Sequence, residues 1–478
     1  MQFYAILKDS FREAIDGFVI YLMIGLSLLL VVILGSISYA PDAATDALPK
    51  ALGREFQLIF PARGASSAPT GMPVEYHATE IEDVSNGAKF VLKVGPLKQE
   101  ADQKNGQPEP QKPVDKKKDE PDMFRSAVYA WKEPAGEKIK NPFAKMGGQG
   151  KGGGRTKNEI EIVTPAIAGP ADLRAITDDE MVAFLKYQFT TFVGVDVVKI
   201  TRRPGIAEPE YKFDVEITGI SGARGWPHSV YVFFGAVPPF KGVPLGEALY
   251  FIQDVIVNGI GAAVTLMISV VITAFFIPNL LRKGSIDLLI SKPISRVGLL
   301  VYKYIGGLTF IFILSSISIG GVWLVMAARS GSWSPGFLLV IPVLTFTFAI
   351  LYSVSTVVAV FTRSAIASIL VTLGFMLCLY IFGQVKSFFD LNKIAAVTEL
   401  PEWSYTLVDG LNTILPRYKD LDKLTTKIVV DNTMTEGQAR LTGIFTEYPS
   451  WGGAVGVSLA FIAVMLALSC WRFIRRDN

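Results

Sequence analysis

Hydrophobic positions gather in six long blocks along the chain, separated by polar segments of very different lengths. Each block is about 20 residues long, which lets a single α-helix cross a hydrocarbon core of about 30 Å. The interiors of the blocks carry no Asp, Glu, Lys, Arg or His. The pattern therefore predicts a membrane all-α bundle of six transmembrane helices, at residues 18–39, 259–281, 304–328, 337–361, 364–385 and 452–471.

The first block has a competing interpretation. It follows a short basic segment and precedes small residues at Ser38 and Ala40, as in a cleaved secretory signal. However, the apolar run is longer than a usual signal core, and Pro41 stands where cleavage would be obstructed. We therefore expect a retained first span, preceded at residues 1–17 by an amphipathic elbow helix.

Basic residues set the expected orientation. Ends of the spans that are rich in Lys and Arg alternate with ends that carry few, and the positive-inside rule places the basic ends in the cytoplasm. Both termini are then cytoplasmic, and the polar segments after the first and fifth spans lie outside the cell membrane. The basic residues are Lys8, Arg12, Arg282, Lys283, Lys292, Arg296, Lys303, Arg363, Arg472, Arg475 and Arg476.

This topology divides the chain into consecutive parts. Inside the first long outer segment, about 98–157 is rich in Lys, Gln, Pro, Asp and Gly, which predicts a disordered insertion. The parts are the elbow helix at 1–17, the first span at 18–39, an inserted extracytoplasmic α+β domain at 40–247, spans two to five at 248–385, an outer segment at 386–450, and the sixth span with a cytoplasmic tail at 451–478.

Local patterns predict both helix and strand in the inserted domain. Thr177 and Glu180 have the spacing of a capping box, ahead of a helix whose apolar face includes Phe184. Alternating or β-branched apolar residues predict strands at 55–60, 89–94, 159–163, 211–218 and 229–234. In the second outer segment, apolar residues at helical spacing predict a helix that either lies along the membrane or packs under the domain; they are Leu407, Leu411, Ile414 and Leu415.

Composition adds exclusions. The net charge of +3 gives no global field for nucleic acid. The cysteines Cys378 and Cys470 lie inside apolar blocks and the histidines His77 and His228 are far apart, so we expect neither a disulfide nor a metal site. Lys151 follows glycines as in a phosphate-binding loop, but three more glycines follow it where Ser or Thr and a helix are needed.

The spans contain no recognisable chemistry of their own. Ion-coupled carriers place titratable residues inside the membrane, and these spans have none, although carbonyl sites on helices broken at Pro278 and Pro342 stay open. No motif combines a nucleophile, a base and an orienting group. We therefore expect no catalytic residue, no cofactor and no enzyme activity, with energy supplied by a separate partner.

The cytoplasmic connection between the second and third spans is the candidate site for receiving that energy. Ser285 can cap a short helix, with Asp287 in its first turn, where a negative charge suits the helix dipole. Pro293 ends it. The expected product is a coupling helix at 285–291 across the inner mouth of the protein, after which Ser295 can cap the third span.

A string in this connection resembles one in the type-2 permease family of ATP-binding-cassette transporters, in the subgroup of multi-copper-enzyme-maturation permeases. The tight inner turn at 361–364 and the amphipathic start of the chain are also similar to that family. Asp287 stands where glutamate is more usual, and the large insertion after the first span departs from minimal members. The string comprises Gly284, Ile286, Asp287, Leu288, Leu289, Lys292, Pro293, Ile294, Ser295, Arg296, Lys303, Gly306 and Gly307.

The resemblance implies the permease subunit of an exporter in the bacterial inner membrane, as a homodimer or pseudo-dimer surrounded by lipid. A separate cytoplasmic ATPase is then expected to dock on the 281–300 loop. The implied docking residues are Ser285, Asp287, Leu288, Leu289, Lys292, Pro293 and Arg296. Small residues at spacing four, Ser316 with Gly320 and Gly452 with Gly456, favour close packing of spans within one subunit.

Two other functions remain open at this point. One is a four-span type of permease that transmits force to envelope proteins, against which six spans and the string at 284–296 argue. The other is a membrane-anchored sensor or assembly scaffold whose outer domain binds a ligand, against which the lack of a cytoplasmic signalling domain argues. The sequence does not identify a transported substrate.

Overall fold

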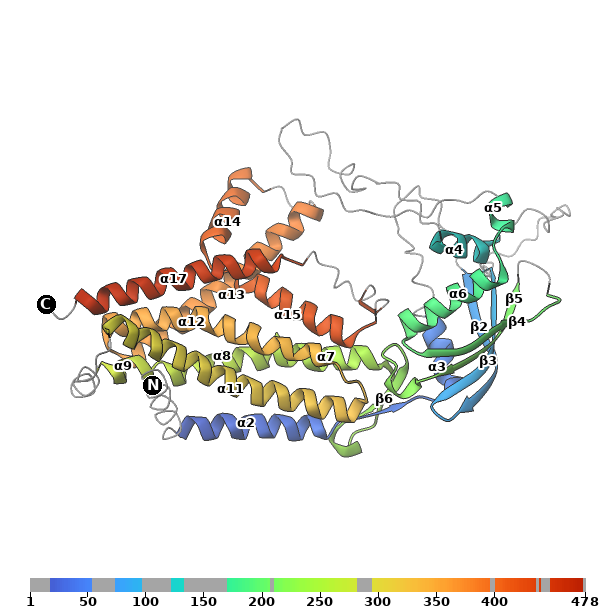
Figure 1. Ribbon diagram of the computed structural model, residues 1–478, viewed down its shortest axis with the longest axis horizontal. Helices are drawn as coiled ribbons and strands as arrows, with labels where there is room; N and C mark the ends of the chain where they lie inside the picture. The colour runs from blue at the N-terminus through green and yellow to red at the C-terminus, as the bar shows by residue number, and fades with distance from the viewer. Residues whose placement is uncertain are drawn as a thin grey trace, which may run out of the picture.

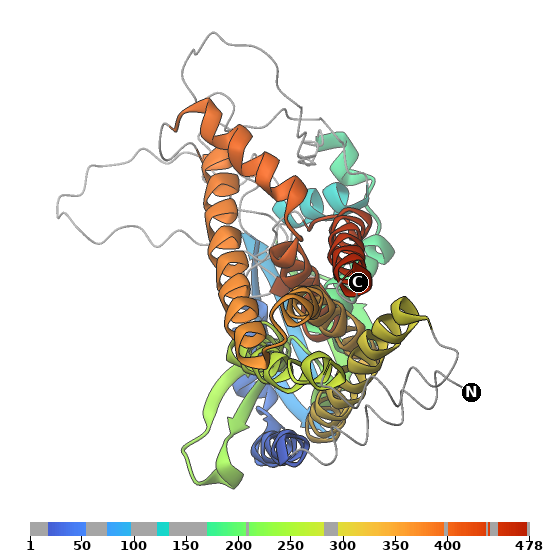
Figure 2. The ribbon, with the colours of Figure 1, turned by 90° about the vertical axis from the view of Figure 1, so that its left-hand side faces the viewer.

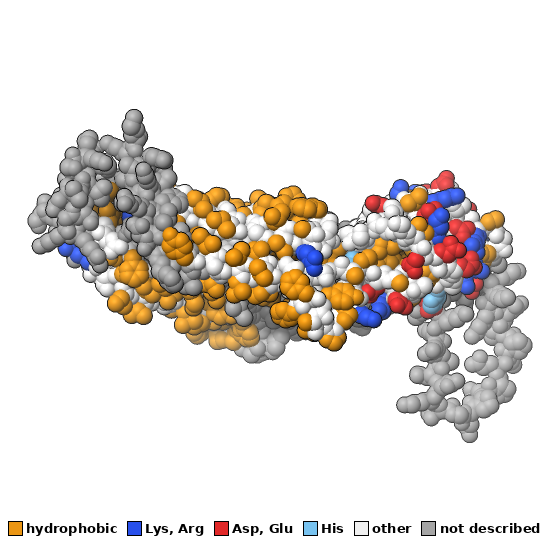
Figure 3. Space-filling model, turned by 90° about the horizontal axis from the view of Figure 1, so that it is seen from below, with side chains coloured by type: hydrophobic (Ala, Val, Ile, Leu, Met, Phe, Trp, Pro, Cys, Tyr) orange, Lys and Arg blue, Asp and Glu red, His pale blue; other side chains and the backbone are white. Residues whose placement is uncertain are grey.

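Long helices form a bundle with a sheet-containing domain at one end, called here the outer domain (Figure 1). The computed structural model describes residues 18–53, 74–96, 122–132, 170–206, 210–281, 295–395, 400–435, 438–439 and 448–475. Hydrophobic side chains cover the bundle, whereas charged side chains gather on the outer domain (Figure 3). An apolar bundle joined to a charged domain is the layout of a membrane protein with a water-exposed part.

Five helical segments among the described residues are long and apolar enough to cross a membrane, and they match the last five hydrophobic blocks. The first block forms a shorter apolar helix, α2 (Phe18–Gly35), which packs along α11 (Arg296–Ser330). It ends before residue 39 because strand β1 (Ser38–Pro41) begins there. The five candidate spans are Leu245–Leu280, Val297–Ser330, Pro335–Thr362, Ala365–Asp390 and Trp451–Arg475.

The second span starts earlier than expected from residue 259. It consists of α7 (Leu245–Val257), α8 (Ile260–Thr273) and α9 (Phe276–Leu280) in succession. The hydrophobic block missed α7 because Glu247 and Asp254 interrupt its apolar run. In the structure α7 is amphipathic, and its buried residues are Leu245, Gly246, Leu249, Gln253 and Val257.

Helix α12 (Val340–Thr362) lies at the centre of the bundle (Figure 2). It follows the short helix η7 (Pro335–Leu339). It carries no charged side chain, and many of its residues are buried, as expected for a helix packed among others. Its neighbours are α8, α9, α11, α13 (Ala365–Ala395), α15 (Tyr418–Thr433) and α17 (Trp451–Arg475).

The pairs of small residues at spacing four do not bring helices close together at their glycines. A Cβ added at Gly320, Gly452 or Gly456 would meet nothing within 4 Å, so the expected close packing at these glycines is wrong. A glycine spacing is compatible with a close helix crossing but does not create one.

The predicted helix of the second outer segment is α14 (Glu402–Ile414). Its apolar residues do not pack under the described part of the outer domain, since Leu407, Leu411 and Ile414 are 52%, 40% and 74% exposed.

The outer domain is built on an antiparallel four-stranded sheet of order β2-β3-β5-β4. Along β5 alternate residues Tyr211, Phe213, Val215 and Ile217 are buried, as expected for a sheet with one covered face. Strands β3 and β5 confirm the predictions at 89–94 and 211–218. The strands are β2 (Val74–Val84), β3 (Gly87–Pro96), β4 (Asp196–Arg202) and β5 (Tyr211–Thr218).

Helices cover this sheet, which confirms the α+β class of the domain. Helix α6 (Asp178–Gln188) has the predicted capping box: Glu180 N donates to Thr177 Oγ1 at 3.3 Å, and Thr177 N donates to Glu180 Oε2 at 2.9 Å. The same core includes α3 (Ala44–Ala51) and α4 (Met123–Lys132). Phe124, Ala127 and Val128 of α4 are buried, so this short part of 98–157 is ordered, and the remainder of the stretch lies outside the described residues.

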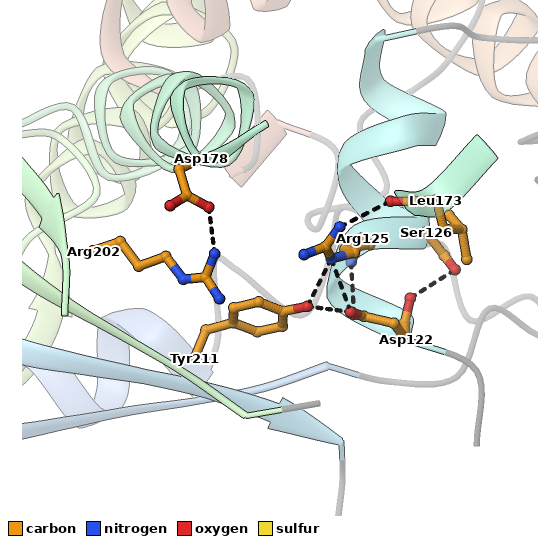
Figure 4. A network of polar contacts seen from close by, with 7 residues as sticks. All are labelled: Asp122, Arg125, Ser126, Leu173, Asp178, Arg202 and Tyr211. Atoms are coloured by element: carbon orange, nitrogen blue, oxygen red, sulfur yellow. Dashed lines mark hydrogen bonds and ion pairs between the residues drawn. The ribbon is translucent and has the colours of Figure 1, made fainter. Parts of the chain in front are cut away.

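A polar network fastens α4 to the sheet (Figure 4). Tyr211 donates its hydroxyl hydrogen to Asp122, and Arg125 Nε donates to Tyr211 Oη at 3.0 Å. Arg125 also donates to the carbonyl of Leu173 at 3.1 Å, which joins α5 (Pro170–Arg174) to the same cluster. The guanidinium of Arg202 lies 5.0 Å from the centre of the Tyr211 ring. The sequence pattern misses this helix because its polar anchors are remote along the chain.

A second sheet, of order β1-β6-β7, connects the domain to the bundle. It comprises β1, β6 (Pro227–Tyr231) and β7 (Phe240–Pro244). Strand β1 follows α2 directly along the chain, and β7 leads directly into α7. The strand expected at 229–234 ends early, at Tyr231, because Phe233 and Phe234 have positive φ. The strands expected at 55–60 and 159–163 lie outside the described residues.

Candidate functional site

The end of the bundle away from the outer domain, called here the inner end, brings the two ends of the 281–300 loop together. Leu281 and Leu300 belong to one buried cluster with Ile277 and Phe473. Beside it, Leu280 and Leu299 form a second buried contact. The end of α9 and the start of α11 are therefore packed against each other, and we call these two clusters the inner platform.

The predicted docking residues are only partly within reach of the structure. The coupling helix at 285–291, with Ser285, Asp287, Leu288 and Leu289, lies outside the described residues, as do Lys292, Pro293 and the elbow helix at 1–17. Arg296 is the first residue of α11. The docking assignment therefore stays a prediction, and the described geometry is that of its attachment points.

Ser295 confirms the predicted cap at the start of α11. Its backbone is extended, with φ −67° and ψ 144°, and Gly298 N donates to its Oγ at 3.1 Å. The side chain thus satisfies one of the amides that a helix N-terminus leaves without an internal partner. The cap fixes the residue at which the loop ends and the long helix begins.

About two turns into α11, a charged and an aromatic side chain hold the helix against its neighbours. Lys303 is 3% exposed, with its ammonium 5.6 Å from the centre of the Phe276 ring of α9. The ring of Tyr304 stacks on Tyr352 of α12 at 5.0 Å, and its hydroxyl donates to the Ala349 carbonyl at 2.8 Å. A displacement of α11 at this level must therefore move α9 and α12 as well.

The inner turn between α12 and α13 completes the platform. Arg363 caps α12 in a left-handed conformation, with φ 56°, and its amide donates to the Ala359 carbonyl at 2.8 Å. Across the turn, Ser368 Oγ donates to the Ser355 carbonyl at 2.7 Å. Arg472 of α17 lies 5.3 Å from the centre of the Phe361 ring, which ties the last helix to the turn.

The opposite end of the bundle is joined to the outer domain through Arg224. Its Nη2 donates to Ser334 Oγ at 2.8 Å, and its carbonyl accepts from Gly246 N at 2.7 Å and from Gln438 Nε2 at 2.9 Å. Burial lowers the pKa of Arg224. The sequence pattern missed this junction because its members are remote along the chain. Arg329 adds a second link, donating to the Ile37 carbonyl at 2.8 Å.

A charged cluster also lies where the outer segment returns into the bundle. Lys386 Nζ on α13 bridges Asp390, at 2.6 Å, and Asp409 of α14, at 2.9 Å. On α15, burial raises the pKa of Asp422, whose partner Lys419 lies at 2.7 Å. Within the described residues no group of three or more His, Cys, Asp or Glu could hold a metal ion. Each of these carboxylates thus has a lysine partner, with Lys386 shared between two of them, which is typical of structural ion pairs.

Taken together, these observations define a class: a multi-pass membrane protein whose long helices connect an inner platform to an outer domain. The family model described as "ABC-2 family transporter protein" matches residues 6–478, and the chain belongs to this family. It is thus an ABC-2 type permease, the membrane subunit of a transporter. Membrane subunits of this family are generally not catalytic and in general work with an ABC ATPase. A comparison with curated proteins found no match.

Proposed function

We propose that this permease belongs to an exporter of the bacterial inner membrane, in which a separate cytoplasmic ATPase docks on the 281–300 loop. The docking contacts are the polar Ser285, Asp287, Lys292 and Arg296 and the apolar Leu288 and Leu289, with Pro293 ending the short helix. In this proposal α2 crosses the membrane as the first span, which brings the number of spans to six. Both termini are cytoplasmic, and two permease copies, or a pseudo-dimer, form the path.

One observation supports this proposal above the others: Leu281 and Leu300 lie in the same buried cluster, on either side of the loop. A push on the loop is therefore delivered to α9 and α11 at the same point. Because packed interiors transmit displacement rather than absorb it, both helices respond together. The Lys303 and Tyr304 contacts pass the movement to α12.

Charge supports the proposed orientation. The described helices α8, α9, α11, α12 and α17 contain no Asp or Glu, whereas Lys303, Arg363, Arg472 and Arg475 lie toward the inner end. By the positive-inside rule this end faces the cytoplasm. The outer domain then lies across the membrane from the ATPase, and α7 and α11 carry the motion to it through the Arg224 junction.

The test reverses the charge of Asp287. Affinity-purified full chain from host membranes is probed for bound ATPase by mass spectrometry and by ATP hydrolysis. We expect the amount of ATPase that co-purifies with Asp287→Arg to fall about tenfold or more. A tenfold weaker affinity corresponds to ~1.4 kcal/mol of binding free energy. The matched control is Glu82→Arg, which makes the same change of charge at an exposed position of the outer domain. Full retention of the ATPase with unchanged hydrolysis in Asp287→Arg contradicts the docking assignment.

A further inference from the structure

The tip of the β6–β7 hairpin exposes a run of apolar side chains. From Phe233 to Phe240 the sequence is FFGAVPPF, with no charged or hydrogen-bonding side chain. Phe233 is 56% exposed, Phe234 77%, Val237 38% and Phe240 58%. A continuous apolar patch of this kind on a water-exposed domain marks a site of contact with another apolar surface.

The backbone of the tip holds these rings outward at the expense of strain. Phe233 and Phe234 both have positive φ, 52° and 56°, a region that aromatic residues rarely occupy. Turn hydrogen bonds maintain it: Gly235 N donates to the Val232 carbonyl and Ala236 N to the Phe233 carbonyl, both at 3.1 Å. Two consecutive strained phenylalanines that do not pack inward indicate a role outside the domain.

The tip lies at the level where α2 ends. Phe234 N donates to the carbonyl of Ser36 at 3.0 Å, and Ser36 directly follows α2 (Phe18–Gly35). The register agrees, because the pairing of Ser38 with Tyr231 and of Pro41 with His228 makes β6 run back toward α2. An 18-residue helix spans roughly 27 Å, close to the thickness of a hydrocarbon core. The hairpin tip is thus at the outer boundary of the membrane.

We infer that the tip of this hairpin inserts Phe233, Phe234 and Phe240 into the outer leaflet, at the boundary between headgroups and acyl chains. The lipid bilayer is the occupant because the tip is hydrogen-bonded to the end of α2, an apolar helix whose Leu28 is 63% and Val32 54% exposed. Figure 3 shows that hydrophobic surface extends along the bundle as far as its junction with the outer domain.

Nearby charges suit lipid headgroups. Lys50 and Lys241 are exposed, and the ammonium of Lys50 lies beside Gly242 at the base of the hairpin. Amphipathic anchors combine apolar insertion with basic residues that meet anionic headgroups. Because β1 and β7 continue into α2 and α7, the inserted tip holds the connecting sheet at the membrane surface. This anchor does not depend on the ATPase that drives the permease.

A lipid-sensitive label tests the inference. In a full chain carrying Cys378→Ser and Cys470→Ser, the variant Phe234→Cys is labelled with an environment-sensitive fluorophore and placed in nanodiscs of phosphatidylcholine and phosphatidylglycerol. We expect blue-shifted emission that loses most of its intensity when the lipids carry a spin label near the headgroup. Val198→Cys on β4, at a position that is 61% exposed, is the matched control and should show water-like emission without quenching.

The outcomes separate lipid from other partners. Water-like emission at position 234 overturns the inference. A blue shift that spin-labelled lipid does not quench also overturns it, because the ring site is then covered by protein, such as a second copy of the chain. Phe240→Cys repeats the measurement on the returning strand, where φ is not strained, in case Phe234→Cys does not fold.

Discussion

Gly307 of α11 lies directly against the ring of Tyr352 on α12: a Cβ at Gly307 would be 2.7 Å from Cε1 of that ring. The ring has no free space to retreat into, because it stacks on Tyr304 at 5.0 Å and on Phe348 at 5.4 Å. The close approach of the third span to the central helix at this level therefore requires a residue without a side chain.

Gly307→Ala is expected to destabilise the bundle by about 1–3 kcal/mol, the usual cost of forcing an extra carbon into a packed interior. Thermal unfolding of the full chain in nanodiscs measures the effect. Gly320→Ala is the matched control on the same helix, since a Cβ there meets nothing within 4 Å. Equal melting temperatures for the two variants would show that the contact with Tyr352 is not limiting.

Ser295→Ala is expected to loosen the first turn of α11 by about 1 kcal/mol, because it removes the acceptor for the Gly298 amide. Hydrogen exchange of the amides at 296–300 should become faster. Ser295→Asp keeps an acceptor in place and should preserve protection. If both variants exchange alike, the hydroxyl is not the cap that holds the loop end.

Tyr211→Phe is expected to loosen the attachment of α4 to the sheet, since Asp122 loses a donor and Arg125 an acceptor. A buried polar network that loses one member costs about 1–3 kcal/mol. Exchange of the amides of α4 should accelerate, whereas Tyr187→Phe, a change at a ring that contacts Trp131 and Phe192, should leave it unchanged. Unchanged protection of α4 in Tyr211→Phe would contradict the role of the network.

His228 should make the connecting sheet sensitive to acid. Burial lowers the pKa of His228. Its Nδ1 lies 2.8 Å from the Trp226 carbonyl oxygen and its Nε2 lies 3.3 Å from that of Ser221, and these two contacts offset only part of the effect of burial on the pKa. A lowered folded-state pKa contributes stability above the unfolded value of about 6.5, and this stability is lost as pH falls through the folded value. The melting temperature of the full chain should therefore fall more steeply below pH ~6.5 than that of His228→Gln. Parallel curves would mean that His228 is not desolvated.

Local sequence determined much of this protein. The apolar blocks determined five candidate spans, the spacing of Thr177 and Glu180 determined a capped helix, and Ser295 determined where α11 begins. Each of these features depends on residues within one helical turn or one continuous apolar run, so interactions between neighbours along the chain are enough to form it.

Only the tertiary structure decided which of these elements act together. The sequence could not place Leu281 against Leu300, Arg224 against Ser334, or the hairpin tip beside Ser36, because these contacts join residues on separate elements. The sequence also wrongly predicted close helix packing at Gly320, because the space around a glycine depends on where the neighbouring helices lie. Packing between distant segments, rather than local preference, therefore created the inner platform, the outer junction and the exposed hairpin.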